Sequence, residues 1–190
     1  MRKSKEEAAK TRRRIVKAAA TEFRRHGISE TGLSELMAAA GLTHGGFYRH
    51  FDSKEQLVAE ACAAAVEPEV DSFLAVCSQK CEQKALEALA ANYLSTKHRD
   101  DPSGGCPFAA LGSELARSDE HTRATATASF TKLVDMVAAR LDKTKPEVAK
   151  QRALVALSLM IGALTLSRIV NDPKLSADIL RQAKKQIATV

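Results

Sequence analysis

The segment 33–54 constrains the fold of this 190-residue chain more than any other part of the sequence. Apolar residues recur at helical spacing over residues 33–40, and Gly41 follows them. Glycine ends a helix readily because it adopts the left-handed conformation without a steric penalty. A second helix, 44–51, is predicted after Thr43, which is a good N-cap residue. The segment therefore predicts two short helices joined by a glycine turn.

The second predicted helix has an apolar inner side formed by Phe47 and Phe51. Its other positions hold hydrogen-bond donors, an aromatic ring and small residues: Thr43, His44, Gly45, Gly46, Tyr48, Arg49 and His50. In a helix-turn-helix unit the second helix enters the major groove of DNA, with its start over base edges and its end near phosphates. We therefore expect bases near Thr43, His44 and Gly46. Phosphates are expected near Tyr48, His50 and Lys54.

Two consecutive glycines near the start of this helix need an explanation, because each costs about 1 kcal/mol relative to alanine inside a helix. Close approach of Gly45 and Gly46 to DNA is one explanation. A helix that begins late or frays is the other. The residues alone leave both open.

The segment resembles the DNA-binding part of the TetR family of bacterial transcriptional regulators. The residues that carry the resemblance are Thr31, Leu36, Ala40, Gly41, Leu42, Gly45, Phe47, Tyr48, His50, Phe51, Ser53, Lys54 and Glu55. The resemblance implies a three-helix DNA-binding domain followed by an all-helical domain that dimerises and binds an effector. It also implies phosphate contacts for Thr31, Tyr48, His50 and Lys54. Gly46 departs from the family pattern, in which a hydroxyl or small side chain is more common, so base reading would rest on few direct contacts.

The charge of the chain is concentrated in the same region. Residues 1–54 hold 12 Lys and Arg against 6 Asp and Glu, whereas residues 55–190 hold 17 against 17. A basic excess confined to one module is typical of phosphate binding and predicts a steep salt dependence. A solvated basic tail or a membrane-surface patch is the alternative, but Arg12, Arg13, Arg14 and Lys17 lead directly into an apolar helix face.

The first ten residues are too polar to bury, so we expect a disordered basic arm over 1–10. No apolar stretch of the signal-peptide kind follows these charges. We therefore expect a protein of the bacterial cytoplasm that is associated with the nucleoid when bound to DNA.

The composition favours an all-α fold, because alanine-rich runs are long and no segment alternates with period two. About nine helices are expected, at 6–26, 33–40, 44–51, 54–78, 82–98, 107–117, 120–142, 147–170 and 175–188. The expected domains are a DNA-binding domain over 11–54 and an effector-binding and dimerisation domain over 55–190.

The segment 154–166 is apolar on every side and contains no charged residue. It is shorter than the roughly 20 residues of a membrane span, so we expect it to be buried between its own domain and a second subunit. The predicted homodimer interface combines this segment with the last helix. Its residues are Leu154, Ser158, Leu159, Gly162, Leu166, Ile179, Ala183 and Ile187. A two-fold dimer would read a roughly palindromic operator, whereas a monomer with a buried central helix is the alternative.

Cys106 precedes Pro107, a residue suited to the first position of a helix. A thiol at a helix N-terminus has a lowered pKa and a larger thiolate fraction. The two preceding glycines would leave this thiol little shielded, so Cys106 is a candidate sensor of oxidants or electrophiles. The alternative is a small buried residue that caps a helix without a redox role.

The other cysteines, Cys62, Cys77 and Cys81, are interpreted as core thiols. Cys77 and Cys81 lack the second pair of ligands that a zinc site needs. Neither a metal nor a cofactor is therefore expected.

An effector pocket needs apolar walls with a few polar groups. The candidate residues lie in the central helices, and many of them would equally serve as core: Phe73, Leu89, Tyr93, Phe108, Leu111, Phe130, Leu133, Val134, Met136, Val137 and Met160. They favour an apolar or weakly polar small molecule, which the sequence does not identify.

Two other classes of protein compete with a regulator. An enzyme would need a nucleophile with a nearby base or a phosphate-binding loop, and neither pattern is present. An architectural, weakly sequence-specific DNA-binding protein would use the same basic region, but it would not need the neutral, apolar remainder of the chain. The sequence favours a dimeric, effector-responsive regulator, and repression rather than activation rests on the resemblance alone.

Overall fold

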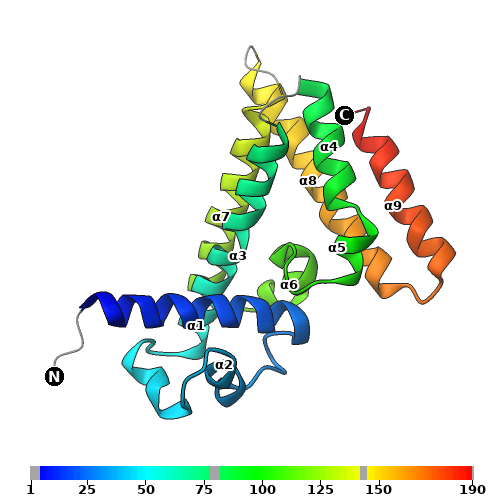
Figure 1. Cartoon of the computed structure of the whole chain (residues 1–190). Helices are drawn as coiled ribbons and strands as arrows, with labels where there is room; N and C mark the ends of the chain where they lie inside the picture. Colours follow the sequence, from blue (N-terminus) through cyan, green and yellow to red (C-terminus); the bar gives the residue numbers. More distant parts are fainter. Residues whose placement is uncertain (1–4, 78–81, 142–144, 190) are drawn as a thin grey trace. The chain divides into compact units, whose positions relative to one another are not determined.

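The computed structural model describes the backbone of residues 5–77, 82–141 and 145–189, and the side chains there except 68–77, 82, 83 and 85. The described residues form helices and no strand (Figure 1). The elements are α1 (Lys5–His26), α2 (Leu33–Ala39), the 3₁₀ helix η1 (His44–Arg49), α3 (Lys54–Cys77), α4 (Glu82–Tyr93), α5 (Thr96–Asp100), α6 (Pro107–Leu115), α7 (Glu120–Ala138), α8 (Pro146–Ile169) and α9 (Pro173–Ile187). The predicted all-α class is confirmed.

The chain forms two compact units, and neither is continuous in sequence. The first comprises residues up to Glu67 together with Ser103–Thr127, and the second comprises Pro68–Pro102 together with residues from Ala128 onward. The first unit is thus larger than the 11–54 expected for the DNA-binding domain, because it includes the start of α3 and all of α6.

The core of the first unit joins α1, α2, η1, α3 and α6. Large side chains of α1 and η1, such as Phe23 and Phe47, are fully buried in it. Leu111 and Leu115 of α6 belong to the same cluster. Burial of such side chains is the main stabilising contribution, at roughly 1.5–3 kcal/mol each.

The turn after α2 has the predicted conformation. Gly41 has a φ of +65°, and its N–H donates to the carbonyl of Ala38 at 2.8 Å. The N–H of Leu42 donates to the carbonyl of Met37 at 2.8 Å. These two bonds form a Schellman motif, which satisfies carbonyls that the helix end would leave without donors.

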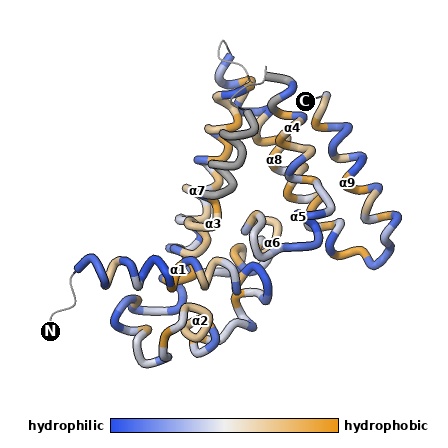
Figure 2. Tube along the Cα trace, in the orientation of Figure 1, coloured by the Kyte–Doolittle hydropathy of each residue, from blue (hydrophilic) through white to orange (hydrophobic). Residues whose placement is uncertain are grey.

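In the second unit, α9 packs against α8 and α4, and α5 packs against α8. Alanines line the buried side of α8, among them Ala149, Ala153 and Ala156. Asp172 caps α9 by accepting from the N–H groups of Lys174 and Leu175. Hydrophobic and polar residues alternate along α9 in Figure 2, as expected for a helix with one buried side.

Three local predictions were wrong. Residues 5–10 begin α1 instead of forming a disordered arm, and Glu6 and Glu7 favour a helix start there through the helix dipole. The segment 44–51 is a 3₁₀ helix that ends at Arg49, because the two glycines disfavour an α-helix. The helix expected over 82–98 is broken at Ser95, whose hydroxyl caps α5 by accepting from the N–H of His98.

By length and composition, α8 is one helix that would be able to cross a membrane. The most apolar 18-residue stretch of α8 is 39% buried, so the chain itself covers only part of its surface.

Candidate nucleic-acid interface

The segment η1 is held on the first unit by its aromatic residues. The ring of Phe47 is buried, stacks on Phe51 with centroids 5.5 Å apart, and meets Tyr48 edge-on at 5.1 Å. Tyr48 itself is 66% exposed. One ring therefore anchors the segment, and the neighbouring ring projects into solvent.

The side of η1 that faces away from the core is open. Of the residues predicted to face DNA, Thr43, His44, Gly45, Tyr48 and Arg49 are exposed, whereas Gly46 and His50 are half-buried. A Cβ atom on Gly45 would meet nothing within 4 Å, so its lack of a side chain is not imposed by packing within the protein.

One contact orients a predicted base-reading residue. The hydroxyl of Ser34 on α2 lies 3.1 Å from Nδ1 of His44. This hydrogen bond engages one ring nitrogen and leaves Nε2 as the nitrogen available to another partner. Ser34 was not among the residues predicted for the site.

Two residues predicted to bind phosphate are engaged inside the protein. Thr31 is fully buried, and its hydroxyl donates to the carbonyl of Gly27 at 2.5 Å. The prediction for its side chain is therefore wrong for this conformation. Lys54 is half-buried, and its ammonium group donates to the carbonyl of Ile28 at 2.7 Å. An ammonium group has three donors, so this bond still leaves donors for a phosphate.

A cationic surface covers the outer side of α1. Lys10, Arg13, Arg14 and Lys17 are exposed there and line one shallow groove together with Glu7 and Thr11. The first half of α1 is correspondingly hydrophilic in Figure 2. These residues were recognised in the sequence as a basic run but were not included among the site residues, and their helical spacing is the signal that places them on one side.

Arg12, in the same run, points the other way. Its Nε donates to the carbonyl of His50 at 3.1 Å, and its guanidinium group forms a two-pronged ion pair with Glu60 of α3. The guanidinium carbon lies 4.3 Å from the centroid of the Phe51 ring. The hydrogen bond to Glu60 raises the pKa of Arg12 above its ordinary value.

The end of α1 is joined to α6, a helix far away in sequence. The carboxylate of Glu114 accepts hydrogen bonds from the backbone N–H groups of Ile28 and Ser29, each at 2.9 Å. Arg24 donates through Nε to the carbonyl of Ser103 at 2.8 Å, in the loop that precedes α6. Nothing in the local sequence pattern signalled these contacts, because they join segments about 80 residues apart.

Cys106 is the N-cap residue of α6 and Pro107 is its first residue, as predicted. The cysteine is only 3% exposed, so the expectation of a little-shielded thiol was wrong. Cys62 is also buried, and burial raises the pKa of its thiol to about 11. Cys77 and Cys81 lie outside the residues whose side chains are described.

The predicted effector residues fall in both units. Leu111 belongs to the core of the first unit and Phe108 packs against it, so these two serve as core residues. In the second unit Tyr93, Leu133, Val137 and Met160 are buried, whereas Leu89, Phe130 and Met136 are half-buried. Val134 is buried as well, and the side chain of Phe73 lies outside the described residues.

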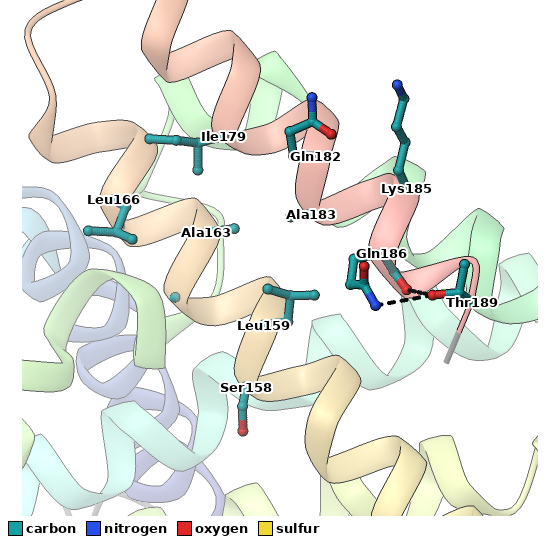
Figure 3. Close-up of a pocket in the computed structure, with 11 residues that line it drawn as sticks. Ser158, Leu159, Ala163, Leu166, Ile179, Gln182, Ala183, Lys185, Gln186 and Thr189 are labelled. Carbon is teal, nitrogen blue, oxygen red and sulfur yellow. Dashed lines mark hydrogen bonds between the residues drawn. The ribbon is translucent and has the colours of Figure 1, made fainter.

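The predicted dimer residues surround a groove between α8 and α9. Leu159, Leu166 and Ile179 line it, together with Ser158, Gly162 and Ala183 (Figure 3). Leu154, at 40% exposed, and Leu166, at 52%, lie on the open side of α8, whereas Ile187 is fully buried. Val155 and Ile169 extend this apolar surface along α8, at 54% and 70% exposed.

Family models match both parts of the chain. Residues 15–61 match the model of bacterial regulatory proteins of the tetR family. Residues 83–186 match the model of the C-terminal domain of LmrA/YxaF-like transcriptional regulators.

Individual proteins agree with these matches. An uncharacterized HTH-type transcriptional regulator of Mycobacterium tuberculosis is 30% identical over 171 residues, which cover 85% of this chain and 86% of the relative. The probable acrEF/envCD operon repressor of Escherichia coli is 41% identical over 59 residues, or 31% of this chain and 27% of the repressor.

Solved structures share the fold over nearly the whole chain. A TetR transcriptional regulator of Chloroflexus aurantiacus matches with a TM-score of 0.74 and 29% identity, covering 97% of this chain and 95% of the regulator. The reduced form of NemR from E. coli matches with a TM-score of 0.80 and 19% identity, covering 95% and 96% of the two chains.

Proposed function

We propose that this chain, which belongs to the TetR family of bacterial DNA-binding transcriptional regulators, is a homodimeric repressor that a small-molecule effector releases from a palindromic operator. The observation that carries the proposal is the exposed outer side of the segment Thr43–Arg49, which belongs to the basic part of the chain. Residues 1–54 hold 12 basic and 6 acidic residues, which accounts for the whole net charge of +6. Such a module attracts phosphates, while its exposed segment supplies the groups that meet bases.

In this proposal the start of the segment reads bases and its end holds phosphates. Thr43 and His44 reach base edges, and Gly45 and Gly46 allow the backbone to approach. Tyr48, Arg49 and His50 lie nearer the DNA backbone, joined by the remaining donors of Lys54. The exposure of Tyr48 supports a phosphate contact by its hydroxyl.

The proposed dimer forms through α8 and α9. The groove between them has a volume of about 630 Å³, which would also accommodate a small ligand. The exposed apolar residues continue beyond the groove along α8, however, at Val155 and Ile169. A continuous apolar helix side of this kind fits a second copy of the chain better than a compact ligand.

In this proposal, a conformational change caused by effector binding in the second unit is transmitted to the DNA-binding unit along the polypeptide chain. The chain passes between the units after Glu67, Pro102 and Thr127, and the last two crossings bracket α6. Because α6 holds the end of α1 through Glu114, a shift of α6 would reorient the DNA-binding elements. The effector shifts the equilibrium only by the difference in its affinity for the two conformations.

Modification of Cys106 is a second candidate trigger. The observation that favours it is the position of Cys106 at the N-cap of α6, the helix that carries Glu114. The similar structure of NemR is described as a reduced form. Because Cys106 is buried, modification would require local opening and would then displace the start of α6. Cys62 is the matched control, since it is also buried and burial raises the pKa of its thiol, which lowers the thiolate fraction.

Fluorescence anisotropy on DNA from beside its own gene, with a scrambled duplex as control, tests the proposal. The regulator requires tighter binding to the native duplex, and equal binding to both supports a weakly specific architectural protein instead. Tyr48→Phe should weaken binding to all sequences alike, whereas His44→Ala should change base preference.

The same assay after mild oxidant and then reductant tests the thiol trigger. Reversible loss of binding that persists in Cys62→Ser and disappears in Cys106→Ser would support it. Unchanged binding after oxidation would leave Cys106 as a structural cap. The protein is proposed to act in the bacterial cytoplasm, where reduced thiols are the rule.

A further inference from the structure

We infer that Arg12 is a positioning residue that fixes the DNA-facing segment η1 between α1 and α3, and that it does not itself bind a phosphate. The inference rests on the proposed DNA-binding role of η1. It separates Arg12 from Arg13 and Arg14, which adjoin it in the sequence and have the same charge.

Helical geometry sends these three arginines in different directions, because consecutive residues are about 100° apart around a helix. Arg13 and Arg14 lie on the exposed side of α1 with Lys10 and Lys17. Arg12 lies on the same side of α1 as the buried residues Ile15 and Ala19. Its side chain is about two-thirds covered, with 33% of its surface exposed.

The guanidinium group of Arg12 contacts three residues, of which one lies in α3 and two lie between η1 and α3. Nε donates to the carbonyl of His50, the residue that follows η1, at 3.1 Å. One terminal nitrogen donates to Oε1 of Glu60 at 2.7 Å, and the other contacts Oε2. The flat side of the guanidinium group lies over the ring of Phe51 at 4.3 Å. These contacts engage three of the five N–H donors and one face of the guanidinium group, so no pair of neighbouring donors is left for two-pronged binding of a phosphate.

The segment that these contacts hold, η1, has little stability of its own. A 3₁₀ helix has poorer hydrogen-bond geometry than an α-helix, and η1 also contains Gly45 and Gly46. His50 and Phe51 are the first two residues after η1, in the short link to α3. Arg12 binds both and is itself held by Glu60, so it fixes the end of η1 relative to two longer helices.

Lysine would not reproduce this arrangement. Its ammonium group is a point charge on a flexible stem, whereas the guanidinium group is planar and serves a carboxylate, a carbonyl and an aromatic ring together. Replacement of Arg12 by lysine therefore preserves the positive charge but removes the planar group that contacts Glu60, His50 and Phe51 together.

Glu60 provides the sharper test, because charge and geometry predict opposite results there. Glu60→Gln removes a negative charge from the basic unit, which would strengthen attraction to DNA if only net charge mattered. The positioning role predicts weaker binding instead, because the amide of Gln is not a two-pronged partner for Arg12 in the way the carboxylate is.

The experiment measures anisotropy of the full-length protein on a duplex enriched from a random DNA pool, over a range of salt concentrations. Arg12→Lys and Glu60→Gln should each weaken binding by about three- to tenfold. The slope of log affinity against log salt should stay at the wild-type value in both. Arg13→Ala is the matched control, and its slope should fall by about 0.9 if that residue meets one phosphate.

Circular dichroism melts establish that each variant is folded at the assay temperature, so that lost affinity is not lost protein. Wild-type affinity in Arg12→Lys together with wild-type or tighter binding in Glu60→Gln would overturn the positioning role. A reduced salt slope in Arg12→Ala equal to that of Arg13→Ala would assign Arg12 to phosphate instead. Failure of the proposed function is distinguishable, since the wild-type protein would then yield no enriched duplex that it prefers over a scrambled one.

Discussion

The carboxylate of Glu114 accepts the backbone N–H of Ile28 at 2.9 Å, although 86 residues separate the two in the sequence. The same carboxylate accepts the N–H of Ser29. A single side chain of α6 thus satisfies two donors just beyond the end of α1. The turn that leads from α1 to α2 is therefore built around a residue outside the segment that matches the DNA-binding family model.

Replacing Glu114 by Ala should destabilise the first unit by about 1–3 kcal/mol, because the partly buried N–H of Ile28 and the exposed N–H of Ser29 lose a charged acceptor. Urea unfolding followed by circular dichroism measures this change. The exposed Glu87 of α4 provides the control, since Glu87→Ala should change stability by less than about 0.5 kcal/mol. Equal effects of the two substitutions would show that the carboxylate of Glu114 contributes little.

The variant Gly45→Ala separates the two explanations of the glycine pair. The added methyl group meets nothing within the protein, so helix propensity predicts stability equal to or up to about 1 kcal/mol above wild type. If the backbone of Gly45 approaches DNA closely, operator affinity should nevertheless fall at least about tenfold. Thermal melts and anisotropy on the same samples measure the two quantities. Unchanged affinity would attribute the glycines to a late-starting helix alone.

Leu166→Glu should convert the protein from dimer to monomer, because a charge would be placed on the exposed side of α8 beside the groove. Sedimentation velocity measures the mass in solution. Thr131 of α7 is exposed and does not line the groove, so Thr131→Glu is the control and should remain dimeric. Dissociation of both variants, or of neither, would contradict the proposed interface.

Acid should weaken the start of α7 through Asp119. Thr122 donates to this carboxylate through both its N–H, at 3.0 Å, and its hydroxyl, at 2.6 Å, and these bonds lower the pKa of Asp119. A carboxyl group with a lower pKa in the folded than in the unfolded state stabilises the fold above the unfolded value, near 3.9, and loses this effect as the pH falls through the folded value.

Asp119→Asn should therefore show a smaller loss of stability than wild type between pH 5 and pH 3, because its amide does not titrate. Urea midpoints at the two pH values measure the difference. Identical losses in the two proteins would remove Asp119 from the groups that cause acid sensitivity.

The helices were predictable because their signals are local. Gly41 and Gly27 end helices through their own backbone preference, with φ values of +65° and +91°, and Pro107 starts one for the same kind of reason. The 3₁₀ character of η1 was missed, although the two glycines that disfavour an α-helix there are visible in the sequence.

The residues that face outward at the site were predictable from the sequence, but the contacts that hold them in place were not. Helical spacing predicts which residues of the second helix face away from Phe47. Tyr48 and Arg49 are among them, and both are exposed. The burial of Thr31 and the contacts of Arg12 and Glu114 depend on residues distant in the sequence. A single sequence carries no local pattern for such contacts.

Leu111 and Leu115 of α6 complete the core that α1 and α2 begin. During synthesis the ribosome releases the N-terminal helices well before α6, so this core remains open while some 50 further residues are added. The nascent DNA-binding module would expose apolar surface for several seconds at the usual rate of elongation. Its folding is therefore tied to the translation of α6, and a gene fragment that stops before α6 would encode a module with an unfinished core.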